Sequence, residues 1–246
     1  VALAGLALIW LVWGAPPQPN FVQVKAGTLS SEAVLLDRHG AILSEVRVDK
    51  QRRRLDWVEL DQISPCLRQA VIRTEDNRFE RHHGVDWLAV TAAALRPGAQ
   101  RGASTISMQL AGLLKPSLRP HGSKRSLGQK WRQLQVALSL ERTWSKDQIL
   151  EAYLNLASFR GELQGIAAAS YGLFDKDPGG LTNTEALLLA AMLKSSSLSP
   201  ERFAGRAAVT AQALGLPVDR AQLAALAHSR LNRPYRYKPS QNLAPH

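Results

Sequence analysis

Residues 74–84 contain the side chains whose types and spacing are best suited to acid–base chemistry. Glu75 and Asp76 stand at the end of an apolar helical run, and Phe79 and His82 follow a few positions further along the chain. A carboxylate at a helix end beside an aromatic ring is partly desolvated, and desolvation favours a group that accepts a proton. The stretch therefore indicates a general base at Glu75. An ordinary solvated helix terminus with an acidic pair is the alternative that the same residues allow.

A hydroxyl-rich stretch and then a basic stretch follow these acids. Residues 102–110 read Gly-Ala-Ser-Thr-Ile-Ser-Met-Gln-Leu, and the basic stretch carries Arg125, Lys130 and Arg132. Residues 87–140 include no acidic side chain and eight basic ones. A window of one charge sign indicates a cleft for a negatively charged group, and a solvated surface is its plain alternative.

The overall composition indicates an anionic partner. With 31 Lys and Arg against 20 Asp and Glu, the chain has a formal net charge of +11. Such a balance suits nucleic acid, an anionic membrane surface or a phosphorylated substrate. Nucleic-acid sites more often interleave aromatic side chains, whereas the basic window interleaves Leu113, Leu114 and Leu118, so we expect a lipid phosphate and no nucleic acid. The one cysteine, Cys66, excludes a disulfide within the chain and a zinc site built on cysteines.

Periodicity and capping signals predict a mainly α fold with a short β hairpin. Residues 32–37 and 41–48 alternate as strands around a turn in which Gly40 supplies a positive φ. The helices are predicted from 3.6-residue periodicity, from Pro65 in a first helical turn and from N-cap signals, namely Asp86, Ser145 with Gln148, Thr182 with Glu185, and Asp219. Their expected ranges are 65–75, 87–95, 105–114 with Ser104 as its N-cap, 127–142, 146–156, 185–194 and 220–231.

The helix expected over residues 127–142 has a defined orientation. Lys130 and Gln133 lie on neighbouring turns of one side. Apolar residues at three- to four-residue spacing predict its core stripe, which consists of Leu127, Trp131, Leu134 and Leu138.

Residues 1–14 form an uncharged apolar run before a Pro-containing stretch. Spanning a bilayer takes about 20 apolar residues, and this run is shorter, so we interpret residues 1–14 as the distal part of a transmembrane anchor. A cleaved signal peptide is the alternative, but no convincing small-x-small cleavage site follows the run. Residues 15–31 are interpreted as a linker and residues 32–60 as a β segment that precedes the main domain.

In order and spacing, these stretches resemble the first three motifs of the family 51 glycosyltransferases, the peptidoglycan polymerases. The family pattern is Glu-Asp-x-x-Phe-x-x-His-x-Gly, then Gly-x-Ser-Thr-Ile/Leu-x-x-Gln, then a Lys-containing motif that usually ends in Glu. The first two patterns occur at residues 75–84 and 102–109, and the resemblance extends over about residues 33–200. Residues 52–60 and 84–87 are most similar to the penicillin-binding protein 1C subgroup.

The resemblance implies a lysozyme-like glycosyltransferase fold with a small jaw subdomain. It implies that lipid II is polymerised into a β-1,4 glycan strand with inversion at the anomeric carbon, on the periplasmic side of a bacterial inner membrane. Lipid II and the growing strand are then the substrates, the anchor and an apolar, basic jaw contact the membrane, and other envelope proteins are candidate partners. Glu75 matches the family's general base. The substrate-binding positions that the resemblance implies are Asp76, Asn77, Ser104, Thr105, Gln109, Arg125, Lys130 and Arg132.

The same resemblance implies domain limits. The glycosyltransferase domain is expected over residues 61–235, and residues 236–246 are expected to form a linker to a serine transpeptidase domain that is missing or absent. No Ser-x-x-Lys motif, which such a domain would carry, occurs in the sequence.

The chain departs from the family pattern at several positions. Gln133 falls where the family has a carboxylate that assists the diphosphate or a divalent ion, and we keep Gln133 as a catalytic position. An amide cannot protonate a leaving group or hold a metal ion by charge. No residue is therefore assigned as a metal ligand, and Mg²⁺ or Mn²⁺ at the pyrophosphate is the one candidate cofactor. Ala92, Gly112 and Gln129 stand where the family usually has basic residues, so weak, altered or metal-independent activity is a further expectation.

Three other functions fit some of the same residues. A lysozyme-like enzyme that cleaves peptidoglycan also uses one buried Glu as its acid, but it would not need the acid-free basic window. A catalytically inactive envelope module that recruits partners would fit the departures from the family pattern. A DNA-binding protein is the remaining class, and a steeply salt-dependent affinity for duplex would identify it.

Overall fold

The computed structural model describes residues 17–95, 104–118, 126–193 and 198–232. Within these ranges the chain is mainly helical with one two-stranded sheet, as predicted. The chain forms two compact units, of which the first comprises Val1–Lys25 and Ile72–Tyr153 and the second Ala26–Val71 and Leu154–His246. The chain passes between the units at the end of helix α2 (Phe21–Ala26) and within helices α3 (Pro65–Glu75) and α7 (Lys146–Leu156). The crossings within α3 and α7 fall inside the region expected to be one domain, whose limits at residues 61 and 235 stay a prediction.

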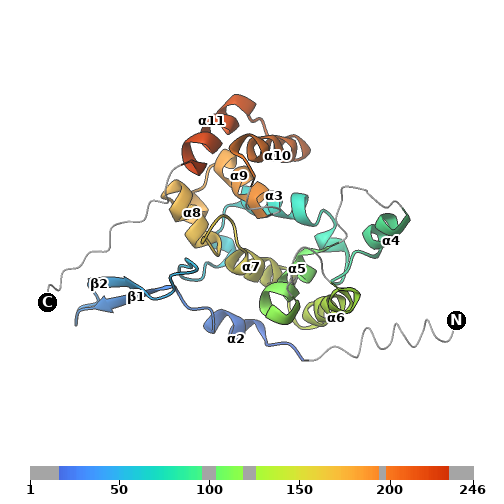
Figure 1. Cartoon of the computed structure of the whole chain (residues 1–246), viewed down its shortest axis with the longest axis horizontal. Coiled ribbons are helices and arrows are strands. Elements are labelled where there is room, and N and C mark those ends of the chain that lie inside the picture. The colour runs from blue at the N-terminus through green and yellow to red at the C-terminus, as the bar shows by residue number, and fades with distance from the viewer. Residues whose placement is uncertain (1–16, 96–103, 119–125, 194–197, 233–246) are drawn as a thin grey trace. The chain divides into compact units, whose positions relative to one another are not determined.

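The first unit is a group of helices around a small apolar core (Figure 1). Helices α5 and α6 pack against each other, and three residues are buried in this core, namely Val85, Met108 and Ala137. The described elements of this unit, besides the parts of α3 and α7, are α2 (Phe21–Ala26), the short 3₁₀ turn η2 (Phe79–Arg81), α4 (Trp87–Leu95), α5 (Ile106–Leu114), η3 (Pro116–Leu118) and α6 (Leu127–Thr143). Helix α2 lies within the residues that the sequence had indicated as a linker.

Local capping signals fix where these helices begin. The side chain of Asp86 accepts hydrogen bonds from the backbone N–H groups of Leu88 and Ala89 at the start of α4. Ser126 forms a capping box with Gln129 at the start of α6. The prediction that Ser104 caps α5 is wrong, because Thr105 occupies the N-cap position. A one-residue shift of this kind is expected where two hydroxyl residues are adjacent, since either can accept an amide hydrogen from the first turn.

The predicted core stripe of α6 is confirmed at Leu134 and Leu138, which are partly buried and pack against the core formed by Val85, Met108 and Ala137. Trp131 is half-buried, and the side chain of Leu127 lies outside what the structure describes. The most deeply buried residues of α6 are a different set, namely Gln133, Gln135, Val136, Ala137 and Leu140. Small residues at the contact allow the backbones to approach closely, so this second set is buried more completely than the apolar stripe.

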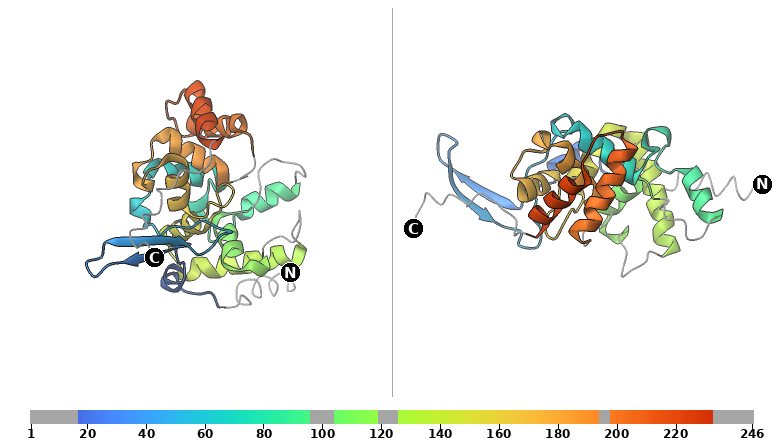
Figure 2. Two further views of the ribbon diagram at one scale, coloured as in Figure 1. Left: turned by 60° about the vertical axis from the view of Figure 1, so that its left-hand side comes forward. Right: turned by 90° about the horizontal axis from the view of Figure 1, so that it is seen from above.

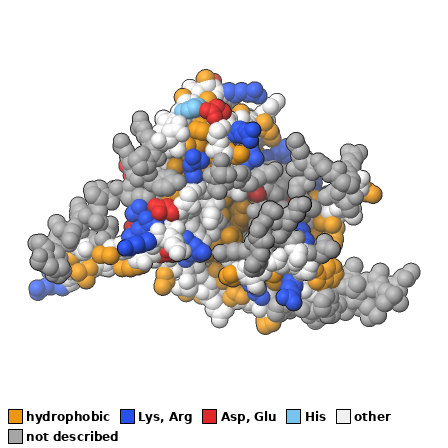
Figure 3. Space-filling model, viewed as in Figure 1, with side chains coloured by type: hydrophobic (Ala, Val, Ile, Leu, Met, Phe, Trp, Pro, Cys, Tyr) orange, Lys and Arg blue, Asp and Glu red, His pale blue; other side chains and the backbone are white. Residues whose placement is uncertain are grey.

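A hairpin begins the second unit. Strands β1 (Glu32–Leu36) and β2 (Ile42–Arg47) pair antiparallel with a register shift between Leu35 and Leu36, as the alternation had predicted apart from the exact ends. Gly40 has φ 82° in the connecting turn, which is the left-handed conformation that glycine adopts most readily. Figure 3 shows hydrophobic side chains along this hairpin, at the left of the view.

The rest of the second unit is a helical core. Helix α9 (Asn183–Leu193) is buried along most of its length, and Thr182 and Glu185 form the capping interaction predicted at its start. Asp219 caps α11 (Arg220–Leu231), as predicted. The other helices are α8 (Ile166–Phe174) and α10 (Pro200–Ala213), and Figure 2 shows α10 and α11 lying side by side.

Among the described residues, none of the helices combines the length and the apolar character that crossing a membrane requires. The apolar run at residues 1–14, interpreted as an anchor, and the expected linker at residues 236–246 lie outside the described residues. Arg125 lies outside them as well.

Candidate active site

Glu75 is the last residue of α3, and its carboxylate is held by an amide on another helix. Gln109 Nε2, on α5, donates a hydrogen bond of 2.9 Å to Glu75 Oε2. Gln109 Oε1 in turn accepts a hydrogen bond of 3.0 Å from the hydroxyl of Tyr153 on α7. The predicted base and the predicted substrate-binding residue Gln109 therefore belong to one hydrogen-bonded chain of three side chains.

Tyr153 is the buried end of this chain. It is 2% exposed, and burial together with the negative charge of Glu75 raises the pKa of its hydroxyl well above the ordinary value. The phenol therefore keeps its hydrogen and acts as a donor. From the sequence, residues 153–155 resemble a later motif of the same family and were interpreted as scaffold, so Tyr153 was not predicted as a site residue.

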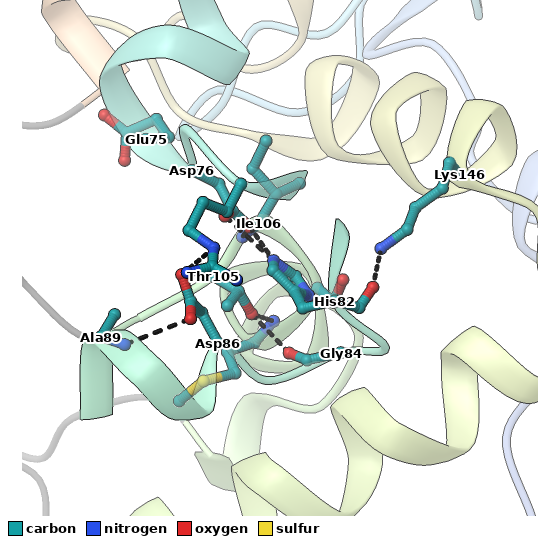
Figure 4. A network of polar contacts seen from close by, with 12 residues as sticks. Glu75, Asp76, His82, Gly84, Asp86, Ala89, Thr105, Ile106 and Lys146 are labelled. Carbon is teal, nitrogen blue, oxygen red and sulfur yellow. Dashed lines mark hydrogen bonds and ion pairs between the residues drawn. The ribbon is translucent and has the colours of Figure 1, made fainter. Parts of the chain in front are cut away.

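Asp76 points away from Glu75 and into the protein. Its carboxylate oxygens lie 3.0 Å from His82 Nε2, and Oδ2 also accepts a hydrogen bond of 2.9 Å from the backbone N–H of Ile106 at the start of α5. An ionised carboxylate only accepts, so His82 Nε2 carries the hydrogen. Figure 4 shows Asp76 directed toward His82 and Ile106, while Glu75 is directed away from them. Asp76 thus connects the end of α3 to the start of α5, and its expected contact with substrate stays a prediction.

Thr105 connects the same two stretches a second time. Its Oγ1 accepts a hydrogen bond from Met108 N as the N-cap of α5 and donates one of 2.6 Å to Gly84 O. Gly84 has φ 88°, and a Cβ at this position would lie 2.7 Å from the carbonyl oxygen of Ala137 on α6. Only glycine permits both this conformation and this close approach. Thr105 is buried, so the structure gives it a structural contact, and its expected role in binding substrate stays a prediction.

Ser104 and Lys130 form the cationic part of the site. Lys130 Nζ donates a hydrogen bond of 2.8 Å to Ser104 Oγ, which directly precedes the N-cap of α5. Ser104 and Gln109 are separated by five positions of the chain, so at about 1.5 Å per helical residue the two residues are about 8 Å apart along the axis. One helix, α5, therefore carries the partner of the carboxylate and, at its start, the partner of the ammonium group. Ser104, Gln109 and Lys130 had all been predicted as substrate-binding.

Gln133, predicted as a catalytic position, is buried between two helices. Its side chain is completely buried, and Nε2 donates a hydrogen bond of 2.5 Å to the backbone carbonyl of Met108. Its Oε1 has no hydrogen-bond partner among the described residues. A Cβ on Gly112 would lie 3.7 Å from Gln133 Nε2, so two positions that depart from the family pattern are neighbours at the contact of α5 with α6. The amide ties these two helices together, and a part in catalysis stays a prediction.

The remaining predicted positions lie at the surface or outside the described residues. Asn77 is exposed, and its Oδ1 accepts a hydrogen bond of 2.6 Å from Arg73 Nη1. Arg132 is exposed on α6. Arg125 is not among the described residues, so its place relative to Lys130 stays a prediction.

Beneath the site lies a buried charged group that the sequence analysis missed. Glu141 on α6 forms an ion pair of 2.6 Å with Lys146 on α7, and Ser107 Oγ on α5 donates a hydrogen bond of 2.5 Å to the same carboxylate. Lys146 also donates to the backbone carbonyl of His82 and lies 4.5 Å from the ring centre of Phe79. The pair thus joins α5, α6 and α7 to the stretch that follows Glu75. No local sequence pattern could have indicated this charged group, because Ser107 on α5 is brought to Glu141 and Lys146 only by the packing of the helices.

The expectation of Mg²⁺ or Mn²⁺ at the pyrophosphate stays a prediction. Among them, no group of three or more His, Cys, Asp and Glu side chains could hold a metal ion. The position at which the family has a second carboxylate carries the amide of Gln133, which is buried and already donates to a carbonyl. A hard cation such as Mg²⁺ takes carboxylate oxygens and water as ligands, and Gln133 supplies no such charge.

With this geometry described, the chain can be assigned to a family. The family model described as "Transglycosylase" matches residues 39–215, which is more than half of the chain. The chain therefore belongs to the transglycosylase family, a class of glycosyltransferases, and the resemblance recognised from its motifs is confirmed.

Curated relatives have consistent names. A biosynthetic peptidoglycan transglycosylase of Rhodospirillum centenum is 38% identical over 212 residues, which cover 81% of this chain and 80% of that protein. A protein of the same name from Mannheimia succiniciproducens is 43% identical over 141 residues, 56% of each chain. Penicillin-binding protein 1C of Escherichia coli is 41% identical over 155 residues, 61% of this chain and 19% of that protein. The matched region thus spans most of the first relative, 56% of the second and 19% of the third.

Proposed function

We propose that this chain polymerises lipid II into β-1,4-linked glycan strands, with Glu75 as the general base. Family membership and the names of the relatives support a peptidoglycan transglycosylase. One observation carries the mechanism. The Glu75 carboxylate accepts a hydrogen bond from the Gln109 amide on α5, and the ammonium group of Lys130 donates one to Ser104, just before the start of α5.

The reaction that these groups support is an inverting displacement. The 4-hydroxyl of one lipid II unit attacks the anomeric carbon of the growing strand, and Glu75 takes the hydroxyl proton as the new C–O bond forms. The bond from the anomeric carbon to the diphosphate breaks, and its electron pair leaves with the undecaprenyl pyrophosphate. An alcohol is a weak nucleophile until it loses its proton, so a positioned carboxylate accelerates the step.

The leaving group explains the cationic residues. Negative charge grows on the diphosphate as the bond breaks, and fixed cations lower the energy of that transition state by several kcal/mol. Lys130 acts as a point charge, and Arg132 and Arg125 would add bidentate contacts to phosphate oxygens. Lys130 is held by Ser104 before substrate binds, so little reorganisation is needed at the moment of reaction.

A lipid-linked substrate requires that the enzyme reach a membrane surface. Helix α4 exposes three large apolar side chains, Trp87, Leu88 and Leu95, which are 47%, 61% and 82% exposed. A tryptophan beside leucines suits the interfacial region of a bilayer. We therefore place the enzyme at the periplasmic face of the bacterial inner membrane, with α4 contributing to the contact and residues 1–14 as an anchor.

The proposed chemistry uses no protein-held metal ion. Because Gln133 replaces the family's carboxylate and its amide is already bonded, we expect the cationic side chains to carry the charge of the diphosphate. Adding Mg²⁺ or Mn²⁺ to the polymerisation assay is then expected to change the initial rate by less than about twofold, because the cationic side chains already balance the charge of the diphosphate. A rate that requires the added ion would contradict this part of the proposal.

The function is tested with a charge-removing variant and a matched control. Glu75→Gln keeps the size of the side chain and its contact with Gln109 but cannot accept the hydroxyl proton, so polymerisation of labelled lipid II should fall by at least about 10³-fold. Lipid II binding and the thermal unfolding temperature should stay unchanged. Glu80→Gln removes a carboxylate that is exposed in the neighbouring η2 turn and should leave turnover unchanged.

The outcomes separate the candidate functions. Retained turnover in Glu75→Gln would refute the assignment of the base. Soluble fragments released from polymeric peptidoglycan, with no strand made from lipid II, would favour a glycan-cleaving enzyme. Absence of both activities in the native chain would favour the catalytically inactive envelope module.

A further inference from the structure

We infer that Tyr153 is a positioning residue for this reaction, because its buried hydroxyl sets which end of the Gln109 amide faces the Glu75 carboxylate. The inference rests on the proposed function of Glu75 and extends it to a residue that the sequence alone indicated only as part of the scaffold. It depends on two hydrogen bonds that run in one direction, from Tyr153 to Gln109 at 3.0 Å and from Gln109 to Glu75 at 2.9 Å.

A glutamine side chain can present either of two opposite groups to a neighbour. Its NH₂ group donates and its carbonyl oxygen accepts, and the two have nearly the same shape. With the NH₂ group toward Glu75, the ionised carboxylate is stabilised and is ready to take a proton. With the carbonyl toward Glu75, the ionised carboxylate would be repelled, and a protonated Glu75 would donate its hydrogen to the amide and release it less readily.

Tyr153 favours the first arrangement because it supplies a donor at the far end of the amide. Gln109 Oε1 is the acceptor of the tyrosine hydroxyl, and the hydroxyl lies on a side chain that is 2% exposed. Without that hydroxyl, the carbonyl oxygen of the half-buried Gln109 would lose the hydrogen bond that orients it. The amide would then rotate or move to reach another donor, and its hydrogen bond to Glu75 would be weakened.

The position of the three residues makes this arrangement rigid. Glu75 lies at the end of α3, Gln109 in the middle of α5 and Tyr153 in α7, so three separate elements hold the chain of hydrogen bonds. The raised pKa of Tyr153, caused by burial and then by the charge of Glu75, keeps the hydroxyl protonated at neutral and mildly alkaline pH. Each donor in the series polarises the next toward the carboxylate.

The direct test is Tyr153→Phe in the full chain, which removes only the hydroxyl oxygen. The expected result is an approximately tenfold lower kcat for lipid II polymerisation with KM changed by less than about twofold. The acidic limb of the kcat/KM profile should also move to higher pH, because a carboxylate with a weakened donor keeps its proton to higher pH. Tyr171→Phe is the matched control, since the Tyr171 hydroxyl donates to Asp177 in the second unit, and it should change neither quantity.

A double-mutant cycle separates positioning from a merely structural role. Gln109→Met removes the amide at similar volume. In this variant the Tyr153 hydroxyl has no amide to orient. Tyr153→Phe should then cause no further loss of kcat in the Gln109→Met background, although it causes a tenfold loss alone. If the hydroxyl only stabilises the fold, the two losses multiply and the thermal unfolding temperature falls in parallel. That result overturns the inference, as does an unchanged kcat and pH profile in Tyr153→Phe.

The cycle also distinguishes failure of the inference from failure of the proposed function. If Glu75→Gln abolishes turnover and Tyr153→Phe has no effect, Glu75 remains the base and only the positioning role is refuted. If Glu75→Gln retains turnover, the proposed function itself fails, whatever the result at Tyr153.

Discussion

Gly84 offers the sharpest test of how the fold holds the catalytic stretch in place. It follows His82 by two positions, it has φ 88°, and its carbonyl accepts the hydrogen bond from Thr105 that fixes the start of α5. Gly84→Ala would place a Cβ 2.7 Å from Ala137 O and 3.0 Å from Leu138 N. The methyl group therefore meets backbone atoms of α6, which cannot rotate out of the way.

The expected destabilisation is the sum of two effects. An alanine in the left-handed region costs about 1–2 kcal/mol, and forcing one extra carbon into a closely packed contact costs about 1–3 kcal/mol. The free energy of unfolding should therefore fall by about 2–5 kcal/mol. For a chain of this size, each kcal/mol lowers the unfolding temperature by about 2–4 °C, so we expect a decrease on the order of 10 °C.

Gly40 provides a control with nearly the same backbone conformation. It has φ 82°, but no atom lies within 4 Å of the position that a Cβ would occupy. Gly40→Ala should therefore show the conformational cost alone, about 1–2 kcal/mol, and about a third of the temperature decrease. Differential scanning calorimetry of the two variants and the native chain measures both quantities.

The same two variants connect stability to activity. Because the Gly84 carbonyl holds the N-cap of α5, moving it also moves Gln109 relative to Glu75. Gly84→Ala should lower kcat for lipid II polymerisation by about tenfold even at temperatures at which the variant is folded, since misplacement of a catalytic group by about 1 Å costs on that order or more. Equal decreases in unfolding temperature for Gly84→Ala and Gly40→Ala would refute the argument that the close approach to α6 is what requires glycine.

Three further predictions concern charge. Lys130→Ala should lower kcat by about a hundredfold with little change in unfolding temperature, whereas Arg142→Ala, which removes an exposed cation in the last turn of the same helix, should leave kcat unchanged; equal rates in both would contradict the role of Lys130. Gln133→Glu places a carboxylate where the amide now donates to a carbonyl, so the variant must bind a proton when folded, and its stability in urea relative to the native chain should fall as pH rises above about 5. Burial opposes ionisation of Glu185, but hydrogen bonds from Lys176 and from residue 182 outweigh it and hold the pKa of Glu185 below its ordinary value. Glu185→Gln should therefore be less stable than the native chain at pH 7, and the difference should shrink as the pH falls through the lowered pKa of Glu185, where the native carboxylate binds a proton as well; a pH-independent difference in thermal unfolding would contradict this.

The predicted features that the structure confirms are those that depend on neighbours along the chain. The cap of Asp86, the capping interaction of Thr182 with Glu185 and the hairpin turn at Gly40 are all decided within four residues. The short-range pattern of residues 75–84 also indicated the family, whereas the assignment of Glu75 as the base stays a prediction. Even here the cap of α5 was displaced by one residue.

Which side chains meet was decided by the tertiary structure alone. Tyr153 lies 44 positions from Gln109, and Gln109 lies 34 positions from Glu75, so no local pattern relates them. The same holds for Ser107 and Glu141, whose contact depends on how α5 packs against α6.

Gln133 illustrates the physical reason for this division. The sequence put Gln133 on the same side of α6 as Lys130, and the close packing at Gly84 and Gly112 buries its side chain completely. Hydrophobic periodicity indicates the average environment of a helix face, whereas the residues that are finally buried depend on how closely two backbones can approach. The sequence of this chain thus determined its family and the ends of most of its helices, and the packing of α5, α6 and α7 determined which side chains contact Glu75.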